Sequence, residues 1–547
     1  MKEKAIRHVF VFRHCVRSTH DYVKLHADSS SSSSEEIPIS DFFGASTPMP
    51  GWNTPPYWCT ETGAKIIKGT GGFLLKDVIL GETNTNTDTA PKKIGIQIVT
   101  DTNERDSTTS YELYEGLRKT ANDLNKHLDD GKKISTEGLS ELTYDPLLFS
   151  PEDEAFCEAP EENPQRMFRA ISDRISLLPP PQDAAVALTR MANLAGTGTR
   201  SLVDEPSDGY YSLSESSGYE KFEGPLNALK LMSQMVFYSR ASGLPKPFLP
   251  SASLKDVMTF AQWVSWTRSV LEVDNSNKAL KASTMGPAII HALHTGKHRI
   301  LNSEKSPSHD EVDASVVIFV GHDGDLDTIA SAFGLGWTLG PPYLDREYSQ
   351  QITNTERESI LSTPPGAGFH FRYSADDDSL SISYFYPAFF NSTNALNTTG
   401  ILERTPVYLR SSFGSGDADA SFAVETDIVS NVLRIQTTPA SSEGTVLDFL
   451  QSRLSKAVSS HLESDEMDCY SKTMEELCVL GPSCKSLPWS SQETFYRNGF
   501  YILLGLLAFL SVMTALRKIR GRRASRKEFD TLPQRDDCVV NHEVEIT

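Results

Sequence analysis

The chain has 547 residues, of which 39% are hydrophobic, and a formal net charge of −20. This length exceeds what one ordinary hydrophobic core organises, so we expect two domains with additional segments. The negative charge and the lack of a basic stripe argue against nucleic acid as a partner. A small anionic substrate remains compatible with this composition where cations gather locally.

The first predicted strand, Val9–Phe12, leads directly into a group of cationic residues. Its β-branched and aromatic side chains are typical of a buried strand. The next residues, Arg13, His14 and Arg17, place two guanidinium groups and an imidazole where that strand ends. Open α/β sheets bind ligands at this edge. A solvated loop is the alternative for an isolated Arg-His pair.

The segment that follows combines an insertion, a helix and a second strand. Residues 28–36 contain a serine run followed by two glutamates, which predicts a disordered insertion. Thr60 precedes an apolar stretch and is typical of a helix start. The strand Ile94–Val99 then delivers Arg105 to the beginning of another helix, where free N–H groups also favour anions.

Residues 121–301 are dominated by helical patterns. Asn227–Ala241 and Leu254–Leu271 both carry apolar residues at helical spacing, which we assign to core packing. We expect this region to form a helical cap over the sheet edge, where it shapes substrate specificity. The predicted division is therefore a discontinuous core of residues 1–120 and 302–486 with the cap inserted.

A third strand, Ser315–Val320, is followed directly by His322 and Asp323, so that a third strand end carries polar chemistry. A helix is predicted next, ending near Gly334. The segments 369–373 and 380–386 then flank three aspartates and predict a hairpin. We interpret Asp376–Asp378 as a solvated hairpin tip rather than a calcium site, and we expect no metal site and no cofactor.

The C-terminal region predicts a membrane anchor. Residues 499–516 contain no charged side chain, and five arginines and lysines follow within residues 517–523. One transmembrane helix at 499–516, after a linker at 487–498, is therefore expected, with a cytoplasmic tail at 517–547. The alternative is a buried core helix.

The compartment follows from this topology. The ectodomain is expected to be lumenal or extracellular, yet no signal peptide is visible at the N-terminus. Either the start is truncated, which we favour, or the protein is tail-anchored. Sequons at Asn391 and Asn397 favour glycosylation outside the cytosol. Three cysteines cluster before the anchor, which favours disulfides over buried free thiols; they are Cys469, Cys478 and Cys484.

The residues at the three strand ends match the needs of phosphoryl transfer. Guanidinium forks bind tetrahedral oxyanions through two hydrogen bonds each. A neutral histidine can attack phosphorus and form a covalent intermediate, and a nearby carboxylic acid can protonate the leaving oxygen. His14 and Asp323 fit these two roles.

The sequence resembles the histidine acid phosphatases, in particular the bacterial phytase and glucose-1-phosphatase branch. That family has an Arg-His-Gly-x-Arg-x-Pro motif near its start and His-Asp near its end. The similarity spans most of residues 7–486. It rests on residues 13–19, 100–105, 242–247, 321–323, 336–339 and 364–366.

The resemblance implies an α/β fold with a mostly parallel central sheet flanked by helices, and a membrane-anchored phosphomonoesterase active at acidic pH. It implies a small phosphate ester as the substrate. It makes His14 the nucleophile, Asp323 the proton donor, and four residues the phosphate clamp, namely Arg13, Arg17, Arg105 and His322. It also implies disulfides between Cys157 and Cys484 and between Cys469 and Cys478, leaving Cys15, Cys59 and Cys538 unpaired.

Two positions depart from the family motif. Cys15 replaces its glycine, where a thiol beside cations could ionise and be oxidised, and Thr19 replaces its proline. Neither change removes a catalytic group, so we expect an active enzyme. The competing hypothesis is a catalytically impaired, phosphatase-like ectodomain that binds phosphorylated ligands. The natural substrate is not specified by these residues.

Overall fold

A computed structural model describes the chain over a set of separate ranges. They are 6–26, 34–44, 47–80, 95–128, 134, 142–150, 182–196, 212–213, 220–221, 224–253, 256, 276–301, 315–337, 363–387, 402–409, 422–427, 429–438, 444–459 and 467–477. Several predicted features lie outside these ranges: the helix at Leu254–Leu271 almost entirely, the membrane segment 499–516, both sequons (Asn391 and Asn397), and Cys157, Cys478, Cys484 and Cys538.

A large mixed β-sheet forms the centre of the molecule. Its strand order is β14-β15-β11-β10-β1-β8-β4-β5, with β12 pairing to β11. The strands are β1 (Ile6–Arg13), β4 (Ile96–Thr100), β5 (Thr143–Tyr144), β8 (Val316–Gly321), β10 (Gly368–Ser374), β11 (Ser379–Pro387), β12 (Leu402–Thr405), β14 (Phe422–Asp427) and β15 (Val432–Thr437).

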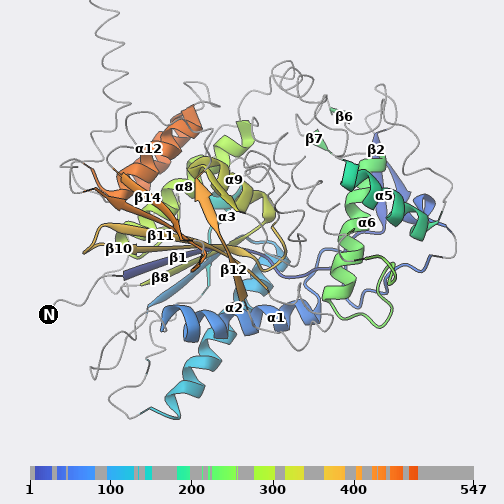
Figure 1. Ribbon diagram of the computed structural model, residues 1–547, viewed down its shortest axis with the longest axis horizontal. Helices are drawn as coiled ribbons and strands as arrows, with labels where there is room; N and C mark the ends of the chain where they lie inside the picture. The colour runs from blue at the N-terminus through green and yellow to red at the C-terminus, as the bar shows by residue number, and fades with distance from the viewer. Residues whose placement is uncertain are drawn as a thin grey trace, which may run out of the picture. The chain divides into compact units, whose positions relative to one another are not determined.

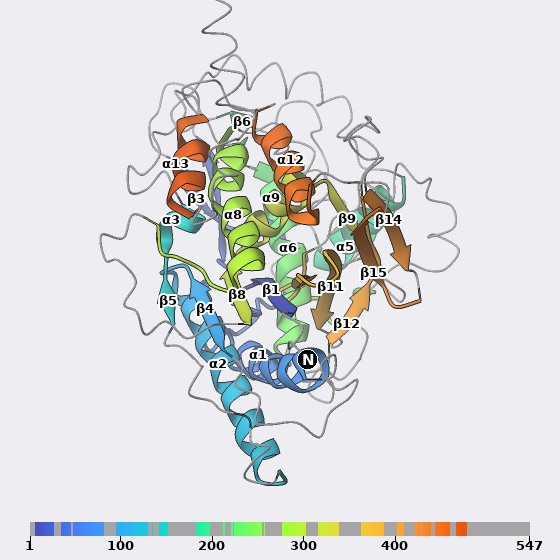
Figure 2. The same cartoon turned by 90° about the vertical axis from the view of Figure 1, so that its left-hand side faces the viewer.

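The three strands predicted to carry the site are neighbours in this sheet. β8 lies between β1 and β4 and is parallel to both (Figure 2). Because both faces of this part of the sheet are covered, the strands have continuous apolar runs, and Val9, Phe10 and Val11 have no exposed surface. The predicted α/β class is therefore confirmed, and the carboxyl ends of the three strands meet at one edge.

The other half of the sheet is antiparallel. β10 pairs with β1 and with β11, which confirms the predicted hairpin. The aspartates at its tip do more than contact solvent, because Asp378 accepts a hydrogen bond from the Val446 N–H at the start of α12 (Val446–Ser459), at 3.1 Å. The hairpin tip thus holds the start of a distant helix.

Helices cover both faces of the sheet (Figure 1). α1 and α2 lie on one face, and α8, α9 and α12 lie on the other. The helices are α1 (Glu61–Phe73), α2 (Glu104–Asn125), α3 (Pro146–Phe149), α5 (Gln182–Ala195), α6 (Gly224–Ala241), α8 (Ser276–Thr295), α9 (Asp323–Phe333), α12 (Val446–Ser459) and α13 (Met467–Leu477), with the short helices η1 (Ile39–Phe42) and η2 (Leu74–Ile79).

The predicted helix starts agree with the structure. Thr60 is the N-cap of α1, and its hydroxyl accepts a hydrogen bond from the Gly63 N–H at 3.1 Å. α9 begins directly after His322 and ends at Gly334, whose φ of 65° suits a glycine C-cap. α6 contains the predicted stripe Asn227–Ala241.

Two findings refine the predicted organisation. Residues 34–36 were expected to be disordered but belong to β3 (Ser34–Pro38), which pairs with β2 (Tyr22–His26) because their backbones form an antiparallel ladder. α2 crosses the predicted boundary at residue 120, and α8, inside the predicted cap, packs on β1 and β10. The division into core and cap itself remains a prediction.

The remaining short strands form small pairs. β9 (Leu335–Trp337) pairs with β13 (Val407–Leu409), and β6 (Ser212–Leu213) pairs with β7 (Glu220–Lys221). Residues 1–477 form one compact unit by their contacts. Among the helices in the described ranges, none is both long and apolar enough to span a membrane.

Candidate active site

The three strand ends bring the predicted site residues together. The backbone N–H of His14, directly after β1, donates to the carbonyl of Gly321 at the end of β8, at 2.9 Å. The rings of His14 and His322 consequently lie edge to face with centroids 5.5 Å apart. Arg105 reaches the same place from the first turn of α2 and contacts His322 Nε2 through its Nη2.

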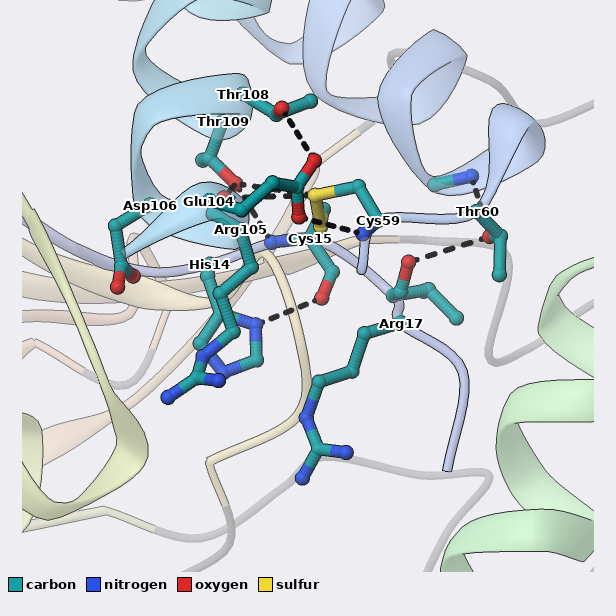
Figure 3. The surroundings of a disulfide bond; sticks show 12 residues. His14, Cys15, Arg17, Cys59, Thr60, Glu104, Arg105, Asp106, Thr108 and Thr109 are labelled. Carbon is teal, nitrogen blue, oxygen red and sulfur yellow. Dashed lines mark hydrogen bonds between the residues drawn. A yellow bond between two sulfur atoms is a disulfide. The ribbon is translucent and has the colours of Figure 1, made fainter. Parts of the chain in front are cut away.

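His14 is held as a neutral imidazole with one defined tautomer. Its Nδ1 lies 2.9 Å from the Cys15 carbonyl oxygen, so Nδ1 carries the proton and donates it (Figure 3). Nε2 is then the unprotonated nitrogen. Burial, followed by the charges of Arg13 and Arg17, holds the pKa of His14 well below its usual range. A buried histidine of this kind keeps a nucleophilic lone pair even in acid.

Two arginines from the loop after β1 flank this imidazole. Arg13 donates from Nη2 to the Tyr238 hydroxyl at 2.9 Å and from Nη1 to the Thr363 carbonyl. Arg17 donates to the Ser18 carbonyl at 3.0 Å, and its guanidinium lies 4.4 Å from the centre of the Tyr57 ring. These contacts fix the direction of both guanidinium groups.

Figure 3 shows how Arg17 and Arg105 are arranged around His14. The guanidinium groups of Arg17 and Arg105 extend to the same side of the Cys15–Cys59 bond as the His14 ring. The structure thus brings Arg13, Arg17, Arg105 and His322 close to His14, and their roles remain predictions. Such a group of fixed donors is suited to a tetrahedral oxyanion.

His322 is paired with two buried carboxylates. Its Nδ1 lies 3.4 Å from Asp325 Oδ2, and its Nε2 lies 3.2 Å from Asp106 Oδ2. Burial alone would lower the pKa of His322, but the hydrogen bond and charge of Asp325 and the charge of Asp106 outweigh it and raise the pKa. The two carboxylates thus favour protonation of His322, and the adjacent Arg105 guanidinium opposes it.

Asp323 is the first residue of α9 and faces the same group. Its Oδ2 lies 3.4 Å from Arg13 Nη2, and its side chain is 24% exposed. The exposure gives this carboxyl group access to a bound ester and to water. Asp323 therefore combines proximity to the cations with a path for proton exchange.

The structure corrects the prediction for two cysteines. Cys15 and Cys59 were expected to be unpaired, but they form a disulfide with Cα atoms 5.8 Å apart (Figure 3). The loop after β1 makes this pairing possible, because Arg17 forms a β-bridge with Cys59. Cys15 is therefore not a reactive thiol. Cys469 is also disulfide-bonded, and its predicted partner Cys478 lies outside the described ranges.

Sequence reasoning missed several residues that hold the site. They are Tyr57, Asp106, Thr109, Tyr238, Thr363 and Asp325. Asp325 could have been found from the sequence, because an acidic residue three positions after His322 is typical of a capping box, and the two residues form one on α9. Tyr57 and Tyr238 had none, because only tertiary packing brings their rings to the arginines.

One acidic cluster has the ligand types of a metal site. Ligand atoms of Asp101, Asp106 and His322 all lie within 4.8 Å of one another. The Asp101 carboxylate already accepts hydrogen bonds from the Thr102 N–H and the Asn103 side chain, both at 2.6 Å. The neighbouring Arg105 guanidinium, whose Nη2 contacts His322 Nε2, would repel a cation at this cluster.

Comparison with solved structures identifies the fold. The phytase from Citrobacter braakii aligns with 85% of this chain and 99% of its own, at 15% sequence identity and a TM-score of 0.52. The apo form of Hafnia alvei phytase gives the same coverage and identity with a TM-score of 0.53. The chain has the fold of these phytases.

A third similar structure is a phytase in complex with an anionic ligand. Hafnia alvei phytase bound to myo-inositol hexakis sulphate covers 85% of this chain at 15% identity, with a TM-score of 0.53. No protein-family model matches the sequence. No curated protein matches it either.

Proposed function

We propose that this chain is a phosphomonoester hydrolase of the histidine acid phosphatase type. The observation that carries the proposal is His14, a buried neutral imidazole that presents an unprotonated Nε2 among Arg13, Arg17 and Arg105. The phytase fold of the chain supports it. The carboxyl group of Asp323 lies beside one of these arginines, with its Oδ2 3.4 Å from Arg13 Nη2.

The proposed reaction has two steps. His14 Nε2 attacks phosphorus, the bond to the ester oxygen breaks, and Asp323 gives its proton to the departing alkoxide. Water then attacks the phosphohistidine, Asp323 takes a proton from it, and phosphate leaves as the P–N bond breaks. The guanidinium groups and His322 bind the equatorial oxygens and stabilise their charge in both transition states.

The decisive experiment is hydrolysis of p-nitrophenyl phosphate by the purified protein. We expect turnover at acidic pH that is abolished in His14→Ala. His127→Ala, which changes an exposed histidine on the surface near the end of α2, is the matched control and should retain the rate. Absence of turnover at every pH from acidic to neutral would overturn the enzyme proposal.

The competing function is a phosphatase-like binding module. The observation that favours it is Cys15, whose side chain and disulfide occupy the position of the family's motif glycine. Binding of inorganic phosphate without turnover of any monoester would support this function. Turnover that depends on His14 would reject it.

We also propose that the chain is a single-pass membrane protein with its catalytic part in a lumenal or extracellular compartment. The charge-free segment 499–516 with its basic flank supports the anchor. The Cys15–Cys59 disulfide supports an oxidising compartment. Protease protection of the catalytic part in sealed vesicles tests this orientation, and digestion of that part from the cytoplasmic side would refute it.

A further inference from the structure

A cavity of about 240 Å³ adjoins the phosphate-binding loop. Thr19 and His20, which directly follow the Arg17 segment, form one wall of it. Met49 and Trp52 come from the segment before α1, and Met235 comes from α6. Three prolines, a serine, a threonine and Asp21 complete the lining.

Shared aromatic residues connect this cavity to the cationic site. The Tyr57 ring lies 4.4 Å from the Arg17 guanidinium and 3.9 Å from the ring centre of His20. Tyr57 is held at a φ of 67°, a conformation that non-glycine residues adopt only where their surroundings impose it. Tyr57 thus forms a fixed boundary between the arginines and the cavity.

Helix α6 also connects the cavity to the cationic site. The Tyr238 hydroxyl accepts a hydrogen bond from Arg13 Nη2 at 2.9 Å, and Met235, about one helical turn earlier, lines the cavity. A phosphate held by the arginines would therefore have this cavity as the neighbouring space for the rest of the ester.

The residues that line the cavity differ in charge from those of the cationic site. The described residues that line it include no lysine and no arginine, and Asp21 contributes a negative charge. Methionine, tryptophan and proline make up the apolar part of its lining, and the polar part is threonine, serine, histidine and aspartate. A leaving group with further phosphates would place them against this wall, where His20 is the one lining side chain among the described residues that can become cationic, which is costly.

We propose that this cavity binds the leaving group and selects monophosphate esters of uncharged, apolar or aromatic alcohols over polyphosphorylated ones. This inference rests on the proposed phosphatase function and specifies its substrate class. It separates this chain from the phytases whose fold it shares.

The first test compares kcat/KM for phenyl phosphate and for myo-inositol hexakisphosphate. We expect the wild-type protein to prefer phenyl phosphate by about tenfold or more, because the second substrate leaves charged groups unpaired. Equal or reversed preference would overturn the inference and leave the phosphatase function standing. If neither ester is hydrolysed at any pH, the proposed function fails and the inference falls with it.

Added charge provides the second test. Met49→Lys introduces a cation into the half-buried wall and should raise the relative kcat/KM for the hexakisphosphate severalfold. Ser40→Lys, at an exposed position of the same lining, serves if Met49→Lys does not fold. Val429→Lys adds the same charge at a fully solvent-accessible position in the β14–β15 turn and should leave the ratio unchanged. An unchanged ratio in both cavity variants would overturn the inference.

Loss of apolar surface provides the third test. Trp52→Ala should lower kcat/KM for phenyl phosphate by roughly tenfold while leaving that for methyl phosphate nearly unchanged, because only the aryl group reaches the cavity. Equal losses for the two esters would show that Trp52 acts on the phosphate site instead, and would contradict a leaving-group cavity.

Discussion

At the scale of single residues, Asp323 has the position required of the proton donor. It is 24% exposed and lies 3.4 Å from Arg13 at the start of α9. We expect Asp323→Asn to slow alkyl phosphates by roughly 10²-fold and activated aryl phosphates much less, since poor leaving groups depend most on general acid catalysis. Steady-state kinetics with both ester classes measures this difference. Equal losses would remove Asp323 from that role.

Asp106 is a second carboxylate at the site, but it acts through His322. Burial raises the pKa of Asp106 to about 7, and its Oδ2 lies 3.2 Å from His322 Nε2. Near and above pH 7, where Asp106 is ionised, Asp106→Asn removes one of the two charges that favour protonation of His322, so the pKa of His322 should fall. We expect the alkaline limb of the kcat/KM profile to shift toward acid by about one pH unit.

The pH profile distinguishes this positioning role from a structural one. A variant that merely loosens α2 would lose activity evenly across the pH range and would leave the limb in place. The control is Thr108→Ala, two residues further along the same helix. The Thr108 hydroxyl donates to Glu104 rather than contacting His322. An unmoved limb in Asp106→Asn would contradict the role assigned to Asp106.

At the scale of elements, the Cys15–Cys59 disulfide joins the loop after β1 to the segment just before α1. It closes a loop with a sequence separation of 44 residues, for which loop-closure entropy gives a stabilisation of about 4 kcal/mol as an upper value. We expect the double variant Cys15→Ala/Cys59→Ala to lose up to that amount in chemical denaturation. The KM of the double variant should rise as well, because Arg17 forms a β-bridge with Cys59.

The double variant is preferable to a reducing agent, because Cys469 is also disulfide-bonded and would be reduced at the same time. Reductant should change the KM of the wild-type protein and leave that of the double variant unaffected. Equal unfolding free energies and equal KM values for the two proteins would show that the backbone contacts hold the loop without the disulfide. Those contacts include the Cys15 N–H, which donates to Thr109 Oγ1 at 2.9 Å.

The close approach of α1 to this loop explains a glycine that the sequence did not single out. A Cβ at Gly63 would lie 2.3 Å from the Val16 carbonyl oxygen, so only glycine fits there. Gly63→Ala should therefore displace the loop and raise KM, with a loss of about 1–3 kcal/mol in stability. Thr62→Ala, the neighbouring position, is the control, and similar kinetics for the two variants would contradict this.

The strands and loops around the site show which of its parts are predictable from the sequence. Apolar runs ending in Arg13, Arg105 and His322 predict strands that share one edge, because parallel strands align their carboxyl ends. The partner of Cys15 was not predictable, since cysteine spacing does not define connectivity. Tyr238 was not predictable either, because its contact with Arg13 joins segments 225 residues apart.

At the scale of the whole molecule, charge is unevenly distributed. The chain carries a formal charge of −20, whereas its site gathers three arginines and His322, whose pKa is raised by Asp325 and Asp106. The parallel half of the sheet presents these cations at its edge. The antiparallel half instead buries titratable groups, of which His8 on β1 and His370 on β10 are hydrogen-bonded at 2.9 Å.

This histidine pair makes the stability of the fold depend on pH. Burial, followed by the charge of Arg372, lowers the pKa of His8 from 6.5 to about 3, and burial also lowers the pKa of His370. Because the folded pKa lies below the unfolded one, the unfolded chain binds more protons between these values. The free energy of unfolding therefore falls as pH drops below 6.5, and His8 alone contributes about 2 kcal/mol of this loss by pH 5.

We expect the double variant His8→Leu/His370→Leu to show a flatter dependence of unfolding free energy on pH, measured by urea denaturation between pH 7 and pH 5. Replacing both rings removes the two partners of this hydrogen bond together, so neither ring is left without its partner. His127→Leu, at an exposed position, should keep the wild-type slope. Identical slopes for the double variant and the wild-type protein would contradict the assignment. A flatter slope would show that this histidine pair contributes to the loss of stability in acid.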